Sequence, residues 1–165
     1  MKYSVFFFLL GIISCSIMNK EKYVTLSSIE EQKFLLNKED SLLIDKENLR
    51  LKKFSDSCDK YKLNCFFCAT DLYPQYEGGI PKFRNDIYQN MIIPRNSKPF
   101  TYKIKMVIGK NDSIKKVEIL NYKDEKVKEE ILRVLSLPEI KKWKSAQSYL
   151  GIKVDFEMIF YLNVK

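Results

Sequence analysis

The sequence predicts an α+β fold: a small antiparallel sheet, made of a hairpin plus a long C-terminal strand, packed against two helices and preceded by a helical arm. Three observations predict it. Residues 101–120 alternate between apolar and polar side chains on both sides of a turn, and residues 154–165 alternate over twelve positions. Apolar residues in 83–91 and 127–135 instead recur at helical spacing. A period of two is typical of half-buried strands, and a spacing of three to four is typical of helices.

The helical arm is the first predicted element. We expect a charged helix from about Ser28 to Phe54, with a break near Asn37, that either packs on the following domain or stands off from a membrane. Ser27 or Ser28 would cap this helix, and Glu30 and Glu31 would lie in its first turn. Its apolar residues are widely spaced: Ile29, Leu36, Leu43 and Ile44.

A short helix is predicted next, from Pro81 to Met91. Phe83, Ile87 and Met91 would share one face, four residues apart. Pro94 prevents the helix from continuing.

The hairpin follows. Apolar positions alternate with Thr101, Lys103, Lys105 and Val107, as in a half-buried strand: Tyr102, Ile104, Met106 and Ile108. Residues 109–113 have turn chemistry, and 114–120 form the partner strand.

The second helix begins at Asp124, a good N-cap residue, and ends before Pro138. One apolar face would cover the sheet: Val127, Ile131, Val134 and Leu135.

The final strand has two different faces. One is apolar: Val154, Phe156, Met158, Phe160, Leu162 and Val164. The other is polar except for Ile159 and Tyr161. The helices would therefore cover the first face, leaving the second exposed.

The N-terminus indicates export. Lys2 and the apolar run from Val5 to Ile13 resemble a signal peptide, because the run is shorter than the roughly 20 residues that a membrane span needs. The residues that end the run, 12–15, resemble a bacterial lipobox, with Cys15 as the lipidated residue. The alternative is an ordinary signal peptide with an incidental cysteine. We therefore expect a signal peptide (1–14), a lipid-anchored tether and helical arm (15–72) and a C-terminal domain (73–165), facing the periplasm of a bacterial cell envelope.

Charge and cysteines narrow the function classes. Residues 16–72 are neutral, whereas 73–165 contain eighteen basic and eleven acidic residues, a net charge of +7. This favours acidic partners, although a solvated lysine-rich face gives the same charge.

Cys58, Cys65 and Cys68 allow one disulfide and one thiol, and their spacing matches no common zinc site. Because the chain also lacks histidine and a spaced carboxylate pair, we expect no metal, no cofactor and no enzyme activity; a thiol mechanism through Cys65 and Cys68 is the remaining enzymatic alternative.

The C-terminal domain resembles the C-terminal domain of TonB and its stand-alone relatives. The matching positions span 73–165: Pro74, Tyr76, Gly78, Gly79, Ile87, Asn90, Pro94, Trp143, Gly151, Val154 and Phe160. The glycines, Trp143 and Phe160 are also explained by turns and core packing. The chain departs from the family at three places. Ser145 stands where a proline is common, and the proline expected before the aromatic residue of the last strand is missing. The 111–113 turn also lacks the Asp-Gly pair that the family prefers.

The resemblance implies that the domain binds an extended peptide of an outer-membrane transporter or another envelope protein. Such binding pairs the peptide with a sheet edge and requires no catalytic residue. We expect the peptide beside the outward face of the final strand, at Glu157, Ile159 and Tyr161. Since residues 16–72 contain no proline and the anchor resembles a lipid, an accessory or adaptor in TonB-type transport fits better than an energy transducer.

The alternative function is a basic domain that grips cell wall or anionic membrane. Its residues would be five lysines: Lys103, Lys105, Lys141, Lys142 and Lys144. We do not expect nucleic acid as a partner, and a homodimer through the final strand is a further arrangement that would hide the peptide site.

Overall fold

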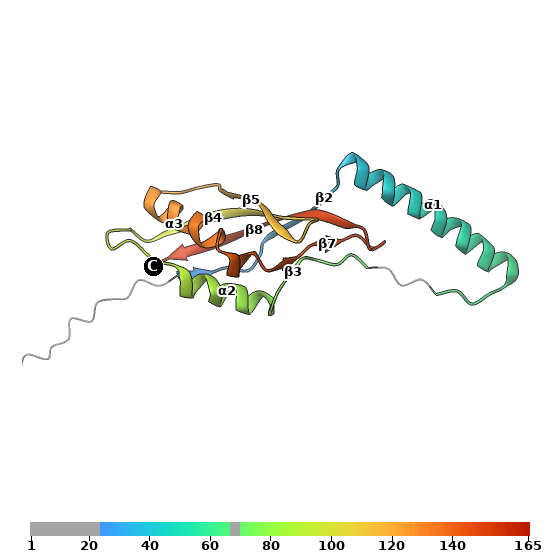
Figure 1. Cartoon of the computed structure of the whole chain (residues 1–165), viewed down its shortest axis with the longest axis horizontal. Coiled ribbons are helices and arrows are strands. Elements are labelled where there is room, and N and C mark those ends of the chain that lie inside the picture. The colour runs from blue at the N-terminus through green and yellow to red at the C-terminus, as the bar shows by residue number, and fades with distance from the viewer. Residues whose placement is uncertain (1–23, 67–69) are drawn as a thin grey trace, which may run out of the picture.

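The structure is a computed structural model that describes residues 24–66 and 70–165. The described residues form three α-helices, a six-stranded antiparallel sheet and a separate two-stranded sheet (Figure 1). The predicted α+β class is therefore confirmed.

The hairpin and the final strand form the centre of the sheet. Strands β4 (Phe100–Gly109) and β5 (Ser113–Ile119) pair across the predicted turn, with a bulge where Lys115 interrupts the register. Strand β8 (Lys153–Val164) runs antiparallel along β4, from Phe100 opposite Val164 to Ile108 opposite Phe156. Both predicted elements are confirmed.

Two further strands, β1 (Val24–Leu26) and β2 (Glu31–Leu35), pair with the other side of β8. The prediction of a helix starting at Ser28 is therefore wrong. These residues belong to the sheet rather than to the arm, and β8 is an inner strand in the order β1-β8-β4-β5. Phe34 explains the preference for a strand, because its ring packs against Phe156 at a centroid distance of 5.0 Å.

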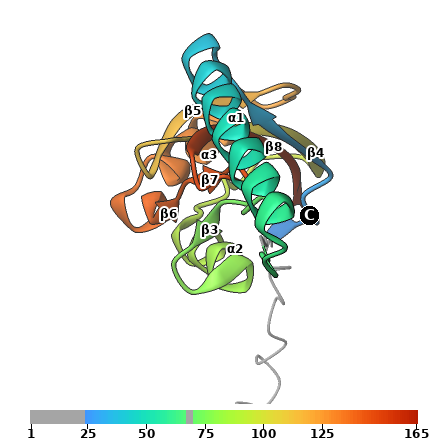
Figure 2. The same ribbon diagram turned by 90° about the vertical axis from the view of Figure 1, so that its right-hand side faces the viewer.

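The arm helix, α1, spans Lys38–Tyr61. The residue near which a break was expected, Asn37, is instead the N-cap of α1. Its side chain accepts a hydrogen bond from the Asp40 amide, and the Asp40 carboxylate accepts one from the Asn37 amide. This capping box stabilises the helix start, so the predicted serine caps are wrong. Figure 1 shows α1 projecting beyond the end of the sheet, and Figure 2, viewed from that end, shows α1 in front of the sheet.

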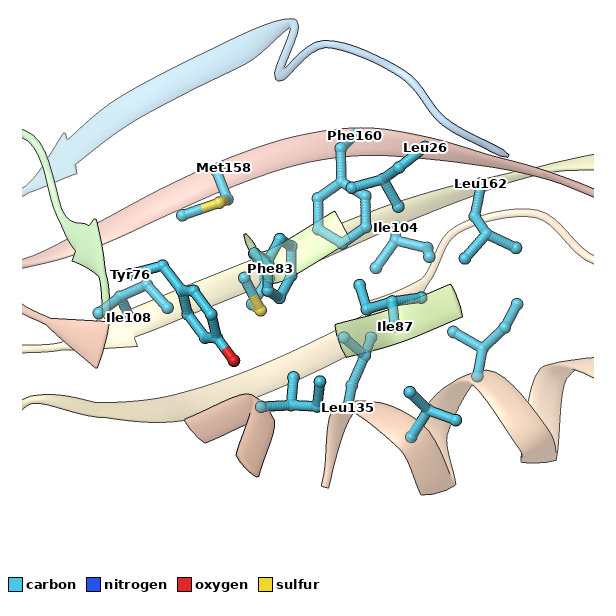
Figure 3. Packing of buried hydrophobic residues seen from close by; sticks show 14 of the residues in the cluster. Leu26, Tyr76, Phe83, Ile87, Ile104, Ile108, Leu135, Met158, Phe160 and Leu162 are labelled. Atoms are coloured by element: carbon cyan, nitrogen blue, oxygen red, sulfur yellow. The ribbon is translucent and has the colours of Figure 1, made fainter. Parts of the chain in front are cut away.

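The remaining helices cover one face of the sheet. They are α2 (Gly79–Asn90), α3 (Glu125–Leu135) and the short 3-10 helix η1 (Pro138–Lys141). The predicted apolar face of α3 is buried, and Asp124 caps the helix by accepting from the Lys126 amide. Figure 3 shows side chains of α2, α3, β4 and β8 in one core. The apolar face of β8 lies in this core, as predicted.

The small sheet ties the start of the domain to this core. It pairs β3 (Gln75–Tyr76) with β6 (Trp143–Lys144), and a third short strand, β7 (Ala146–Gln147), pairs with β8. The rings of Tyr76 and Trp143 lie 5.2 Å apart, both buried. Gly78 and Gly79 both have positive φ, 87° and 79°. The structural explanations for Trp143, Phe160 and these glycines are therefore confirmed.

Candidate peptide-binding site

The residues predicted for peptide binding lie on the face of β8 that no helix covers. Glu157 is directly opposite Lys33 of β2, and Ile159 is opposite Glu31. Tyr161 lies just beyond β2, where Ser27 donates its amide hydrogen to the Tyr161 carbonyl oxygen over 2.8 Å. The expectation that β8 has a free edge here is wrong, because a segment of the same chain already pairs with it.

Strand β1 is held firmly. Leu26 is buried in the core, and its amide donates to the Tyr88 hydroxyl of α2 over 2.7 Å. Arg84, also of α2, donates to the Ser27 carbonyl oxygen over 3.2 Å. Helix α2 thus fixes the outer side of β1.

Strand β2 is held less firmly. Its first three residues are exposed, and its apolar contact with the core is made by Phe34, which also lies 5.5 Å from the Tyr73 ring. Between β1 and β2 the register shifts, so that residues 27–30 lie opposite only two residues of β8, Phe160 and Tyr161. This bulge separates the firmly held strand from the loosely held one.

Ion pairs cross the face of the sheet that no helix covers, which we call the open face. Lys103 lies 3.2 Å from Glu31 of β2, and its Nζ is 5.7 Å from the centre of the Tyr161 ring. Lys105 lies 2.6 Å from Glu118 and 4.0 Å from Glu157. Hydrogen bonds from Lys105 and Lys116 lower the pKa of Glu118 to about 2. Both predicted basic-patch lysines of β4 are therefore engaged with carboxylates.

The other three predicted lysines lie elsewhere. Lys141 ends η1, Lys142 follows it and Lys144 ends β6; all three are exposed. They border a surface hollow of about 590 Å³ beside Tyr76 and Trp143. The structure therefore does not bring the five lysines together into one patch.

The cysteines divide between described and undescribed residues. Cys58 and Cys65 form a disulfide with a Cα–Cα distance of 6.1 Å, so Cys65 is not paired with Cys68. Cys68 and Cys15 lie outside the described residues, as does the predicted signal peptide. Within 24–66 and 70–165, no cluster of three or more His, Cys, Asp or Glu could hold a metal ion. No helix in those ranges is both long and apolar enough to cross a membrane.

Sequence reasoning missed the role of β2 in the site. The stretch 30–35 carries three charges and a glutamine before Phe34 and Leu35, so it shows no clear alternation. The available signal was the spacing of Asn37 and Asp40, which marks a helix start and thereby separates residues 30–35 from the helix.

Comparisons with known proteins assign the chain to no family. No protein-family model, no curated protein and no solved structure matches it.

Proposed function

We propose that the protein is an envelope lipoprotein that binds an extended peptide of an outer-membrane transporter or other envelope protein by strand addition to β8, as an accessory or adaptor in TonB-type transport. One observation carries the proposal. An extended segment, β2, already pairs antiparallel with β8 at Glu157 and Ile159, although it is more than 120 residues away in sequence. The partner peptide would take the position that β2 fills.

The energetics support such an exchange. An incoming strand replaces the backbone hydrogen bonds of β2 one for one, so the difference in free energy depends mainly on side chains. Within β2 these contacts are concentrated at Phe34 and Leu35, because the other three residues of the strand are exposed. Strand β1 remains in place through Leu26 and α2, so the core stays closed while β2 opens locally.

The contacts of β2 define the peptide that would replace it. An aromatic or large apolar side chain is needed at the position of Phe34, to cover Phe156. A carboxylate is favoured at the position of Glu31, where it would pair with Lys103. These two positions are three residues apart and therefore lie on opposite faces of a strand. The partner must also outcompete β2, whose covalent attachment gives it an effective concentration of about millimolar.

A reversible crosslink between β2 and β8 tests the proposal. Lys33→Cys with Glu157→Cys places two thiols directly opposite each other on the open face, at a separation that a disulfide can bridge. The chain from Ser16 onward, which retains all described residues, is used to capture solubilised envelope proteins, with transporters identified by mass spectrometry. We expect the oxidised variant to lose transporter capture by about tenfold or more, and mild reduction to restore it.

The matched control locks a pair that stays together in either state. Lys105→Cys with Glu118→Cys joins β4 to β5 on the same face. Its oxidation should leave capture unchanged. If the β2–β8 crosslink also leaves capture unchanged, peptide addition at β8 is contradicted, and if no transporter is captured by any form, TonB-type partnership is contradicted.

The alternative function, binding to cell wall or anionic membrane, is favoured by the exposure of Lys141, Lys142 and Lys144 around one hollow. Capture of anionic wall polymer that disappears at high salt and with Lys141→Glu plus Lys144→Glu would support it, because exposed charges are strongly screened. Strand pairing, in contrast, should resist salt.

A further inference from the structure

Within the described residues, the first half of helix α1 provides its polar contacts with the body of the protein. Asp40 is buried and lies 3.1 Å from Lys110, in the turn after β4. Asn48 accepts a hydrogen bond from the Tyr149 hydroxyl over 2.6 Å. Figure 1 shows that the second half of the helix extends away from the sheet before the chain returns. We call residues 50–66, which comprise this half and the start of the return, the arm tip.

The arm tip exposes large apolar side chains. Phe54, Tyr61 and Leu63 are 52%, 65% and 61% exposed, and Phe66 is 92% exposed. A hollow of about 440 Å³ opens between the helix and the return. Its apolar lining is Leu51, Phe54, Cys58, Leu63 and Cys65, and its polar lining is Lys52, Ser55, Asp56 and Asp59. No residue of the sheet or of α2 and α3 lines this hollow, so the body of the protein does not cover these apolar groups.

The arm tip as a whole is basic, although both of its acidic residues, Asp56 and Asp59, line the hollow. The arm tip contains five basic residues and two acidic ones, a net charge of +3: Arg50, Lys52, Lys53, Lys60 and Lys62 against Asp56 and Asp59. All five basic residues are exposed, and Lys60 stacks over the Tyr61 ring at 5.4 Å. Exposed apolar side chains bordered by lysines are suited to the boundary between headgroups and acyl chains of an anionic bilayer.

The disulfide gives the arm tip its shape. Cys58 lies in the last turns of α1, and its bond to Cys65 draws the return back against the helix. Leu63, which lies between the two bonded cysteines, is therefore held beside the helix, where it lines the hollow with Leu51 and Phe54. Phe66 follows Cys65 directly on the return.

We propose that the arm tip is a contact site for an anionic lipid surface, which Leu63 and Phe66 enter while the lysines of the arm tip bind the headgroups. A second copy of the chain fits less well, because a symmetric contact through this tip would bring two +3 surfaces together. The proposal uses residues outside the β8 site and does not depend on peptide binding.

Vesicle co-sedimentation tests the proposal. The chain from Ser16 onward is used, since it retains all described residues and lacks the predicted acyl anchor and signal peptide. It is mixed with vesicles of phosphatidylcholine containing phosphatidylglycerol, and with vesicles of phosphatidylcholine alone. We expect binding to the anionic vesicles, reduced about tenfold to hundredfold by Leu63→Ser with Phe66→Ser. Lys60→Glu with Lys62→Glu should reduce it by about tenfold or more.

The matched control changes two exposed leucines of α1 that lie outside the arm tip. Leu42 and Leu49 are 60% and 57% exposed, and neither lines the hollow. Leu42→Ser with Leu49→Ser should bind vesicles as the unchanged chain does. Equal loss in both double variants, or no binding to anionic vesicles, overturns the proposal. A dimer in solution that Leu63→Ser with Phe66→Ser dissociates, without vesicle binding, would identify a second copy as the occupant and also overturn it.

Discussion

At the scale of single residues, a buried polar cluster joins three elements that are distant in sequence. The Tyr76 hydroxyl of β3 lies 2.7 Å from Asp86 Oδ2 of α2 and 2.6 Å from the Glu139 carbonyl oxygen of η1. Lys82 donates to the same Asp86 oxygen over 2.6 Å, which holds the pKa of Asp86 below its usual value. Burial and the neighbouring carboxylate raise the pKa of Tyr76. Tyrosine therefore stays protonated and Asp86 charged at neutral pH, as this geometry requires.

Removing the Tyr76 hydroxyl should lower the free energy of unfolding without creating a large cavity in the core. Tyr76→Phe keeps the ring contacts with Phe83 and Trp143. It removes the one hydroxyl hydrogen that lies between the Asp86 carboxylate and the Glu139 carbonyl oxygen, and leaves Lys82 as the side-chain donor to Asp86. We expect the free energy of unfolding to fall by about 1–3 kcal/mol, measured by urea denaturation. Tyr61→Phe, at an exposed tyrosine of the arm, should change it by less than about 0.5 kcal/mol. Equal effects of the two substitutions would contradict the role of the cluster.

At the scale of elements, strand β2 shows where sequence reasoning ends. The hairpin, α2, α3 and β8 could be predicted because each has its own apolar period and its own turn or cap. Strand β2 has neither. It forms because the Phe34 ring packs against Phe156 and Tyr73, and no local sequence pattern encodes this contact. The same long-range contact determines that Glu157 and Ile159 are covered, so the state of the predicted site could not be read from the sequence.

Phe34 should therefore control how often β2 opens. Phe34→Ala removes its edge-to-face contact with Phe156 and should destabilise the pairing of β2 by about 2 kcal/mol, less than for a fully buried phenylalanine. Native-state hydrogen exchange should show faster amide exchange in residues 31–35. The exchange rates of the amides through which β4 and β8 pair with each other should not change. Gln32→Ala, at an exposed position of the same strand, should leave the exchange unchanged. If β4 exchanges faster as well, β2 is not a locally opening element.

At the scale of the whole molecule, the arm and the body should behave as separate units. The core unites residues from β1 to β8, whereas α1 contributes to it no buried apolar residue. The sequence did predict a charged helical arm, but not its start, which depends on the Asn37–Asp40 capping box, nor its disulfide partner, since three cysteines allow three pairings.

Removal of the disulfide separates the two units experimentally. Cys58→Ser with Cys65→Ser releases an eight-residue loop, worth about 2–3 kcal/mol in the chain-entropy treatment, and this loss should fall on α1 alone. We expect helical circular dichroism to decline at lower temperature, while the fluorescence transition of Trp143, which is buried in the body, keeps its midpoint. A matching shift in both signals would mean that arm and body unfold together.

The central position of β8 also has a consequence for biosynthesis. Every strand of the large sheet except β5 is hydrogen-bonded to β8, the last element along the chain. Before β8 has been made, β1 and β2 lack their pairing partner and β4 lacks one of its two, so only the β4–β5 hairpin and the helices can form. The sheet therefore assembles only after residues 153–164 have emerged, in one late step that joins β1 and β2 to β8.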